Sequence, residues 1–101
     1  MQRLKEFTTE NSYLDQGLER YIMNGISAGS FLHAALSGDK ELALIKADVW
    51  NKNRLDYIMM QLEQLPAMSH GSYELTSNWQ RNHNNVRSDY AERVEQQRVL
   101  D

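Results

Sequence analysis

Apolar residues recur along most of this chain with the spacing of amphipathic helices. In residues 12–24 they fall at positions i, i+4, i+7 and i+8, which places them on one helical face: Leu14, Leu18, Tyr21 and Ile22. Ser12, with Asp15 three residues later, resembles a capping box and predicts the start of this helix. The pair Asn24-Gly25 suits a left-handed cap and predicts its end.

Three further helical stretches are expected before residue 66. The first starts within residues 27–30 and ends at Gly38, and Asp39 caps the second, over residues 40–49. The polar run 51–53 then indicates either a true break or a kink in one longer helix. The clearest amphipathic pattern follows and stops at Pro66; its apolar positions are Leu55, Ile58, Met59, Leu62 and Leu65.

A short helix is expected after Ser72, with Leu75 and Trp79 four residues apart. No segment alternates apolar and polar residues for long, so strands are not expected. The pattern therefore predicts an all-α fold, a compact irregular bundle of four or five short helices with a C-terminal tail or extra helix. The expected core is Leu14, Leu18, Ile22, Phe31, Leu32, Leu36, Leu42, Ile45, Ile58, Leu62, Leu75 and Trp79.

The composition changes after Arg81. We expect residues 1–81 to form the helical domain and residues 82–101 to form a linker and a conditional C-terminal helix, with Ser88 as its cap. A single amphipathic segment of this length is marginal by itself. Its apolar stripe, Val86, Tyr90 and Val94, has three candidate docking places: the chain's own core, a second copy in a homodimer, or a target.

Composition narrows the classes of function. With 101 residues and a net charge of −3, the chain is expected to form one domain without the basic footprint of nucleic-acid binding. It contains no cysteine, which excludes disulfides and thiolate chemistry. The first six residues lack the apolar core of a signal peptide, and no apolar run approaches the roughly 20 residues that span a bilayer. We expect a cytoplasmic protein without a membrane partner.

No catalytic or metal-binding constellation stands out. The three histidines, His33, His70 and His83, lack the helical pairing typical of zinc sites, so neither a metal nor another cofactor is expected. There is no Gly-x-Ser-x-Gly, and the glycine pair at 25 and 29 lacks the Gly-Lys-Ser/Thr of a phosphate loop. An enzyme would require residues such as Asp48 and His33 to converge. We expect that the protein is not an enzyme.

A partner-binding site is expected around residues 48–60. Asp48 and Asn51 share a helical face, where they either contact a partner or, as we favour, cap the helix junction. Trp50, Tyr57 and Met60 belong to residue types enriched in interfaces, although a small bundle could equally bury them. With the tail's aromatic residue, the predicted partner-binding residues are Asp48, Trp50, Asn51, Tyr57, Met60 and Tyr90.

A small helical DNA-binding regulator is the alternative. The segment around Asn51 could form a helix-turn-helix, and three basic residues, Lys46, Lys52 and Arg54, cluster there. The neighbouring Asp48 and Asp56 weaken the positive field, however, and recognition requires several phosphate contacts. By this criterion nucleic acid is not the expected partner.

A longer pattern covers about residues 12–80. It comprises Glu19-Arg20-Tyr21, Gly25-Ile26, Gly29-Ser30-Phe31-Leu32, Ala34, Leu36-Ser37, Asp39, Ala43, Lys46, Ala47-Asp48, Asn51, Leu55, Ile58, Leu62, Gly71-Ser72, Glu74 and Trp79. In these residues the chain resembles a group of small helical proteins of tailed phages and prophages, to which no activity is assigned. Many members carry proline where this chain has Ser27, Ala28, Asp56 and Tyr73, all first-turn positions where the exchange is conformationally harmless.

The resemblance implies a shared fold and a phage origin. With the small size and the lack of catalytic residues, it leads us to expect a phage-type accessory protein that acts by binding another protein in the host cell cytoplasm. The expected partner is a host protein or an anti-phage defence protein, which it would modulate or inhibit; anti-CRISPR-like inhibition is one such activity.

Overall fold

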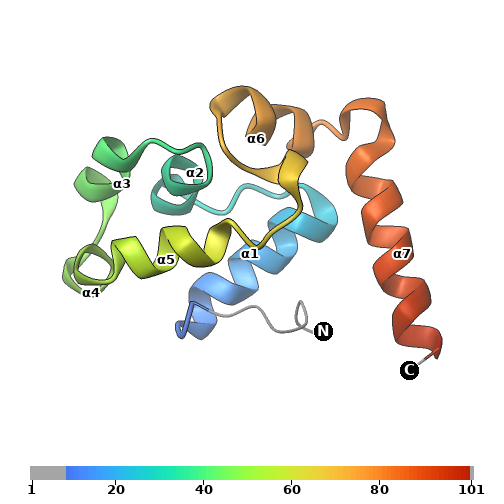
Figure 1. The fold of residues 1–101 in the computed structure, drawn as a ribbon, viewed down its shortest axis with the longest axis horizontal. Helices are drawn as coiled ribbons and strands as arrows, with labels where there is room; N and C mark the ends of the chain where they lie inside the picture. The colour runs from blue at the N-terminus through green and yellow to red at the C-terminus, as the bar shows by residue number, and fades with distance from the viewer. Residues whose placement is uncertain (1–8, 101) are drawn as a thin grey trace.

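The computed structural model describes residues 9–100, and this part of the chain is helical without strands (Figure 1). The predicted all-α fold is confirmed. The first eight residues of the predicted domain and the last residue of the predicted tail lie outside the described part. The α-helices are α1 (Ser12–Asn24), α2 (Ser30–Leu36), α3 (Lys40–Lys46), α4 (Val49–Asn53), α5 (Leu55–Leu62), α6 (Tyr73–Gln80) and α7 (Val86–Leu100), with 3-10 turns η1 (Ala67–Ser69) and η2 (His83–Asn85).

The cap of α1 differs from the prediction. Asn11, not Ser12, caps the helix, because its side-chain oxygen accepts hydrogen bonds from the backbone N–H groups of Tyr13 and Leu14, at 3.0 and 3.3 Å. Asparagine and serine are both favourable cap residues, so the sequence did not distinguish the two neighbouring positions, and the predicted cap was one residue too late. At the other end Gly25 adopts φ 70°, as expected for a left-handed cap, and its N–H donates to the carbonyl of Tyr21 at 2.9 Å.

Residues 40–62 form three helices, which is why the described part holds more helices than the four or five expected. Asp39 caps α3, as predicted, by accepting from the N–H of Leu42 at 3.1 Å. The helix ends at Lys46 rather than at residue 49, because Asp48 starts a new helix by accepting from the N–H of Asn51 at 2.8 Å. The interruption predicted at residues 51–53 is also wrong: these residues are helical, and the break falls at Arg54.

Most of the expected core is buried, with Ile45 as the clear exception. Nine of the twelve expected residues are buried, and Leu42 and Leu75 are half-buried. Ile45 is 75% exposed. The reason is that α3 packs against α2 through Ala43, and a residue two positions further along a helix points to nearly the opposite side.

Two aromatic side chains tie distant parts of the core together. The hydroxyl of buried Tyr21 donates to the backbone carbonyl of Ser69 at 2.6 Å, and burial raises the pKa of this phenol. The indole Nε1 of Trp79 donates to the carbonyls of Tyr21 and Ile22, at 3.2 Å each. These bonds connect α1 to the η1 turn and to α6, so the two aromatic residues fix the centre of the bundle.

The tail begins with a turn built from asparagines. Asn82, Asn84 and Asn85 all have positive φ, which asparagine tolerates better than most residues. The side chain of Asn82 accepts from the N–H of Ser88 and donates to its hydroxyl, both at 2.9 Å. The prediction that Ser88 caps the last helix is therefore wrong: Ser88 lies inside α7, and the side chain of Asn82 accepts from its N–H.

Helix α7 contacts the rest of the chain through its first turns. Val86 and Tyr90 pack against the core, and the Tyr90 ring lies 6.0 Å from the Trp79 ring in an edge-on arrangement. Arg87 donates from Nε to the carbonyl of Trp79 at 3.0 Å and from Nη1 to that of Met23 at 3.5 Å. Of the three docking places considered for the apolar stripe of α7, the structure shows Val86 and Tyr90 packed on the chain's own core.

Candidate partner-binding surface

Three apolar side chains are exposed where α3 passes into α4. Ile45 and Val49 are 75% and 78% exposed, and Trp50 is 40% exposed. We call these three residues the α3–α4 surface. Helices α3 and α4 lie at the end of the molecule opposite α7 (Figure 1). Single exposed apolar side chains are ordinary, but large ones grouped within six residues are typical of a contact surface.

Arg54 contacts two aromatic rings, those of Trp50 in this surface and of Tyr57 on α5. Its guanidinium carbon lies 4.9 Å from the centre of the Trp50 ring and 5.7 Å from that of the Tyr57 ring. The same guanidinium forms an ion pair with the carboxylate of Glu10. Cation–π contacts at exposed sites contribute about 0.5–1 kcal/mol each. Trp50 and Tyr57 are therefore held by a common partner rather than left to rotate freely.

Of the two polar candidates predicted to cap the helix junction, Asp48 does so and Asn51 does not. Asp48 caps α4 through the N–H of Asn51, which is the capping role that the sequence analysis favoured. Asn51 itself is buried, and its side-chain oxygen and the Nε of Arg54 have no hydrogen-bond partner among residues 9–100. An unpaired buried polar atom is unfavourable, so this junction is less stable than its caps alone would indicate.

The remaining predicted residues divide between two places. Met60 is 54% exposed on α5 and lies three residues after the half-buried Tyr57, on the same side of the helix. Tyr57 is linked to the α3–α4 surface through Arg54, which also contacts Trp50. Tyr90 lies instead on α7 against Trp79, so the structure does not bring it together with the other five.

Sequence reasoning missed Ile45 and Val49 as surface residues. Their apolar character and helical spacing gave the same signal as a core position. Asp48 distinguishes a surface position from a core position here, because a cap at residue 48 ends α3 early and makes Val49 the first residue of a new helix.

An ion pair between Lys40 and Asp56, at 2.9 Å, links α3 to α5 and was not expected.

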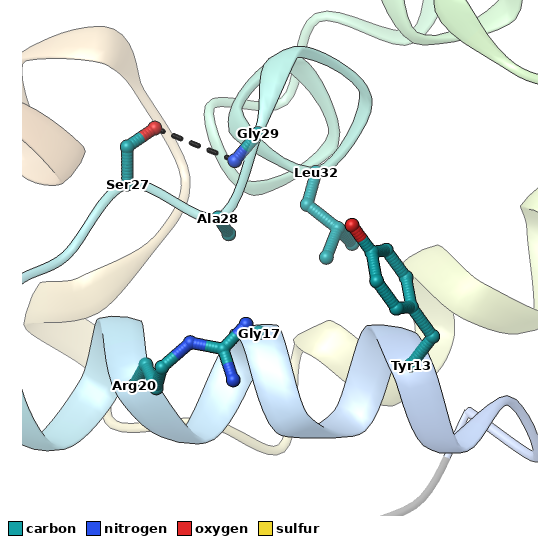
Figure 2. A pocket seen from close by; sticks show the side chains of 7 residues that line it. All are labelled: Tyr13, Gly17, Arg20, Ser27, Ala28, Gly29 and Leu32. Atoms are coloured by element: carbon teal, nitrogen blue, oxygen red, sulfur yellow. Dashed lines mark hydrogen bonds between the residues drawn. The ribbon is translucent and has the colours of Figure 1, made fainter.

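A separate pocket of about 180 Å³ lies between α1 and the segment that leads into α2 (Figure 2). Tyr13, Gly17 and Arg20 line it from α1, and the facing wall comes from residues 27–29 and Leu32. Sequence reasoning did not identify this site, because Gly17 and Arg20 gave no recognisable motif. Asp48 and His33, named above as examples of residues that an enzyme would have to bring together, are not among its lining residues.

Two of the three histidines, His33 and His70, have local contacts. The His33 ring lies 5.6 Å from that of Tyr73, and Nε2 of His70 lies 3.2 Å from the carbonyl of Leu65. Within residues 9–100 no three acidic, histidine or cysteine side chains are grouped so that they could hold a metal ion. None of the helices in that same range is both long and apolar enough to cross a membrane.

Comparison with protein-family models, curated proteins and solved structures finds no match to this chain.

Proposed function

We propose that this protein acts by binding another protein through the α3–α4 surface. The observation that carries the proposal is the exposure of Ile45, Val49 and Trp50 on a segment whose backbone is fixed by two carboxylate caps, Asp39 and Asp48. These caps restrain the starts of α3 and α4 despite the unpaired polar atoms of Asn51 and Arg54, and a restrained backbone loses less conformational freedom on binding, which favours affinity.

The side chains of this surface have the chemistry of an interface centre. Complete burial of an isoleucine or valine side chain contributes about 1.5–3 kcal/mol. Tryptophan is among the residues most enriched at the energetic centre of interfaces, and arginine is another. Arg54 already orders the Trp50 ring, so part of the side-chain entropy is lost before a partner arrives.

The biological role that we propose is that of a phage-type accessory protein. It would modulate or inhibit a host protein or an anti-phage defence protein by covering a surface that the target needs, with anti-CRISPR-like inhibition as one form. The support is the sequence resemblance to small proteins of tailed phages, together with a surface suited to occlusion rather than to chemistry.

A DNA-binding regulator is less well supported by the same geometry. Of the basic residues in the supposed helix-turn-helix, Arg54 is held by Glu10 and two aromatic rings. Helix α4 has only five residues, which is short for a helix that reads a groove. Lys46 and Lys52 remain exposed, so a salt-dependent mobility shift on duplex DNA is the measurement that would favour this alternative.

The test is affinity capture with matched variants. The wild-type chain and the variant Ile45→Gln/Val49→Gln are immobilised and exposed to lysates of bacteria with and without defence systems. Ile26→Gln is the control, because Ile26 is also exposed, at 52%, but lies after α1. We expect a protein that is retained by the wild type and by the control and lost from the double variant. Equal retention by all three chains would contradict the proposal.

A further inference from the structure

The pocket between α1 and α2 exists because two of its positions have no side chain. Tyr13, Gly17 and Arg20 occur at i, i+4 and i+7 on α1, so they share one face. In Figure 2 the side chains of Tyr13 and Arg20 rise from this helix on either side of Gly17. A Cβ at Gly17 would meet only Arg20 and Leu32, each at 4.0 Å, and one at Gly29 would meet nothing within 4 Å. Gly17 therefore leaves space on the α1 side of the pocket, and Gly29 leaves space on the opposite side.

Among the residues that the structure describes, the pocket has one free positive charge, that of Arg20. Arg20 is the sole lining residue, among those that the structure describes, that is charged at neutral pH. Its side chain is exposed, and it takes part in no hydrogen bond or ion pair within residues 9–100. An arginine fork binds a carboxylate through two parallel hydrogen bonds. An unpaired guanidinium at the mouth of a cavity is thus suited to a bound anion.

The rest of the lining is mainly uncharged and partly apolar. Leu32 is buried, Ala28 packs against the core, and the Tyr13 ring forms one side. The N–H of Gly29 already donates to the hydroxyl of Ser27, at 3.4 Å, and is not directed to a ligand. A phosphate dianion would have a single cation and few donors here. A monoanion with a short apolar body fits this lining better.

The volume limits the size of such a ligand. Pockets for drug-sized molecules hold about 300–1,000 Å³. A pocket of about 180 Å³ is smaller and corresponds to about six water molecules at about 30 Å³ each. The ligand, or the part of it that enters, therefore has about six to eight non-hydrogen atoms, as in a branched short-chain carboxylate.

We propose that this pocket binds a short aliphatic carboxylate, with the carboxylate paired to Arg20 and the alkyl group between Leu32, Ala28 and the Tyr13 ring. Two sources have this chemistry: a free small carboxylic acid, and the C-terminal carboxylate of a peptide that ends in an aliphatic residue. The inference is independent of the α3–α4 surface, which involves none of these residues.

The experiment is a titration of the ¹⁵N-labelled full chain, followed by the amide signals of Gly17 and Gly29 and by the Nε–H signal of Arg20. The probes are 3-methylbutanoate, the uncharged 3-methylbutan-1-ol, and inorganic phosphate. The peptide acetyl-Gly-Gly-Leu, as the acid and as the amide, tests the second source. We expect saturable shifts at these three signals with 3-methylbutanoate, with a Kd on the order of millimolar for so small a ligand.

Two variants test the mode of binding. Arg20→Gln should weaken carboxylate binding at least tenfold and leave the alcohol unaffected, whereas Arg81→Gln, an exposed arginine outside the pocket, should change neither. Gly17→Ala places a methyl group in the pocket at an ordinary contact distance and favours the helix, so it should raise Tm while weakening binding at least threefold. This variant cannot lose binding by unfolding if its Tm rises.

The outcomes separate the alternatives. Tighter binding of the peptide acid than of its amide and of the free acid assigns the site to a chain terminus, and the reverse order assigns it to a small metabolite; both support the proposal. The proposal is overturned if the alcohol or phosphate binds as well as 3-methylbutanoate. It is also overturned if no probe shifts the three signals, or if Arg20→Gln and Gly17→Ala both bind like the wild type.

Discussion

The indole N–H of Trp79 donates to the backbone carbonyl of Tyr21 at 3.2 Å, across 58 positions of sequence. The same N–H reaches the carbonyl of Ile22, so one donor serves two carbonyls in the last turn of α1. Carbonyls at a helix end lack partners within the helix. The Tyr21 carbonyl also accepts from the N–H of Gly25, so Trp79 adds a second donor there, supplies a donor to the Ile22 carbonyl, and holds α6 against α1.

This relationship predicts the effect of Trp79→Phe. Phenylalanine retains most of the ring but cannot donate, so the variant should lose about 1–2 kcal/mol of unfolding free energy. Urea denaturation followed by circular dichroism measures the change. Trp50→Phe is the control, since Trp50 lies on the surface and its replacement should change stability by less than about 0.5 kcal/mol. Equal stability of the two variants would show that the hydrogen bonds of Trp79 contribute nothing.

A second prediction concerns the attachment of α7. Arg87 bonds to carbonyls of α1 and α6, so Arg87→Ala should lower the unfolding free energy by about 1–3 kcal/mol. It should also speed amide hydrogen exchange in α7 more than in α2 or α5. Exchange that speeds up equally in all helices would indicate that α7 is not a separate unit.

The same contacts lead to a prediction of the oligomeric state. Because Val86 and Tyr90 pack on the chain's own core, the full chain and a chain cut after Arg81 should both be monomers. The shorter chain should be less stable, since it exposes the core surface that these side chains cover. Light scattering gives both masses, and a full chain with twice the mass of one copy would favour the homodimer instead.

The role of Asp48 can be separated from partner binding. Asp48→Ala removes the cap of α4 and should destabilise the protein by about 1 kcal/mol. Asp48→Asn keeps a side-chain oxygen for the N–H of Asn51 and should retain most of the stability. Thermal unfolding of the two variants measures this difference. If both variants are as stable as the wild type, the cap is not needed and a direct role in binding becomes the better explanation.

Acid should weaken the contact between Tyr73 and Asp39. The Tyr73 hydroxyl donates to the Asp39 carboxylate at 2.6 Å, and this bond, with that from the N–H of Leu42, lowers the pKa of Asp39 below its ordinary value of 3.8. A lowered folded pKa means that the contribution to stability is present above 3.8 and is lost as the pH falls through the folded value. A ¹³C NMR titration should show a higher pKa for Asp39 in Tyr73→Phe. An unchanged pKa would contradict this assignment.

Periodicity predicted the parts of the fold that depend on neighbouring residues. The stripe from Leu14 to Ile22 is buried, and Asp39 caps a helix where expected. Ile45 was misplaced because an apolar residue at helical spacing gives the same signal on either side of a short helix. Its side is decided by the close packing of Ala43 on α2, which is a tertiary contact.

The candidate sites show the same limit. Trp50 and Tyr57 could be chosen from composition, but their common partner Arg54 is oriented by Glu10, which is 44 positions away. The pocket was missed because Gly17 and Gly29 belong to segments that meet only in the folded chain. Residue type indicates what a side chain can do, and long-range packing decides whether it is placed to do it.

Photo-crosslinking inside cells tests whether the α3–α4 surface contacts a protein partner. A photoreactive phenylalanine derivative at position 49 replaces a side chain that is 78% exposed, so the fold should tolerate it. The same derivative at position 68 is the control, because Met68 is also exposed, at 53%, but lies in η1. We predict a cross-linked product of higher mass from position 49 and none from position 68. No product from position 49, or the same product from both positions, would contradict the claim.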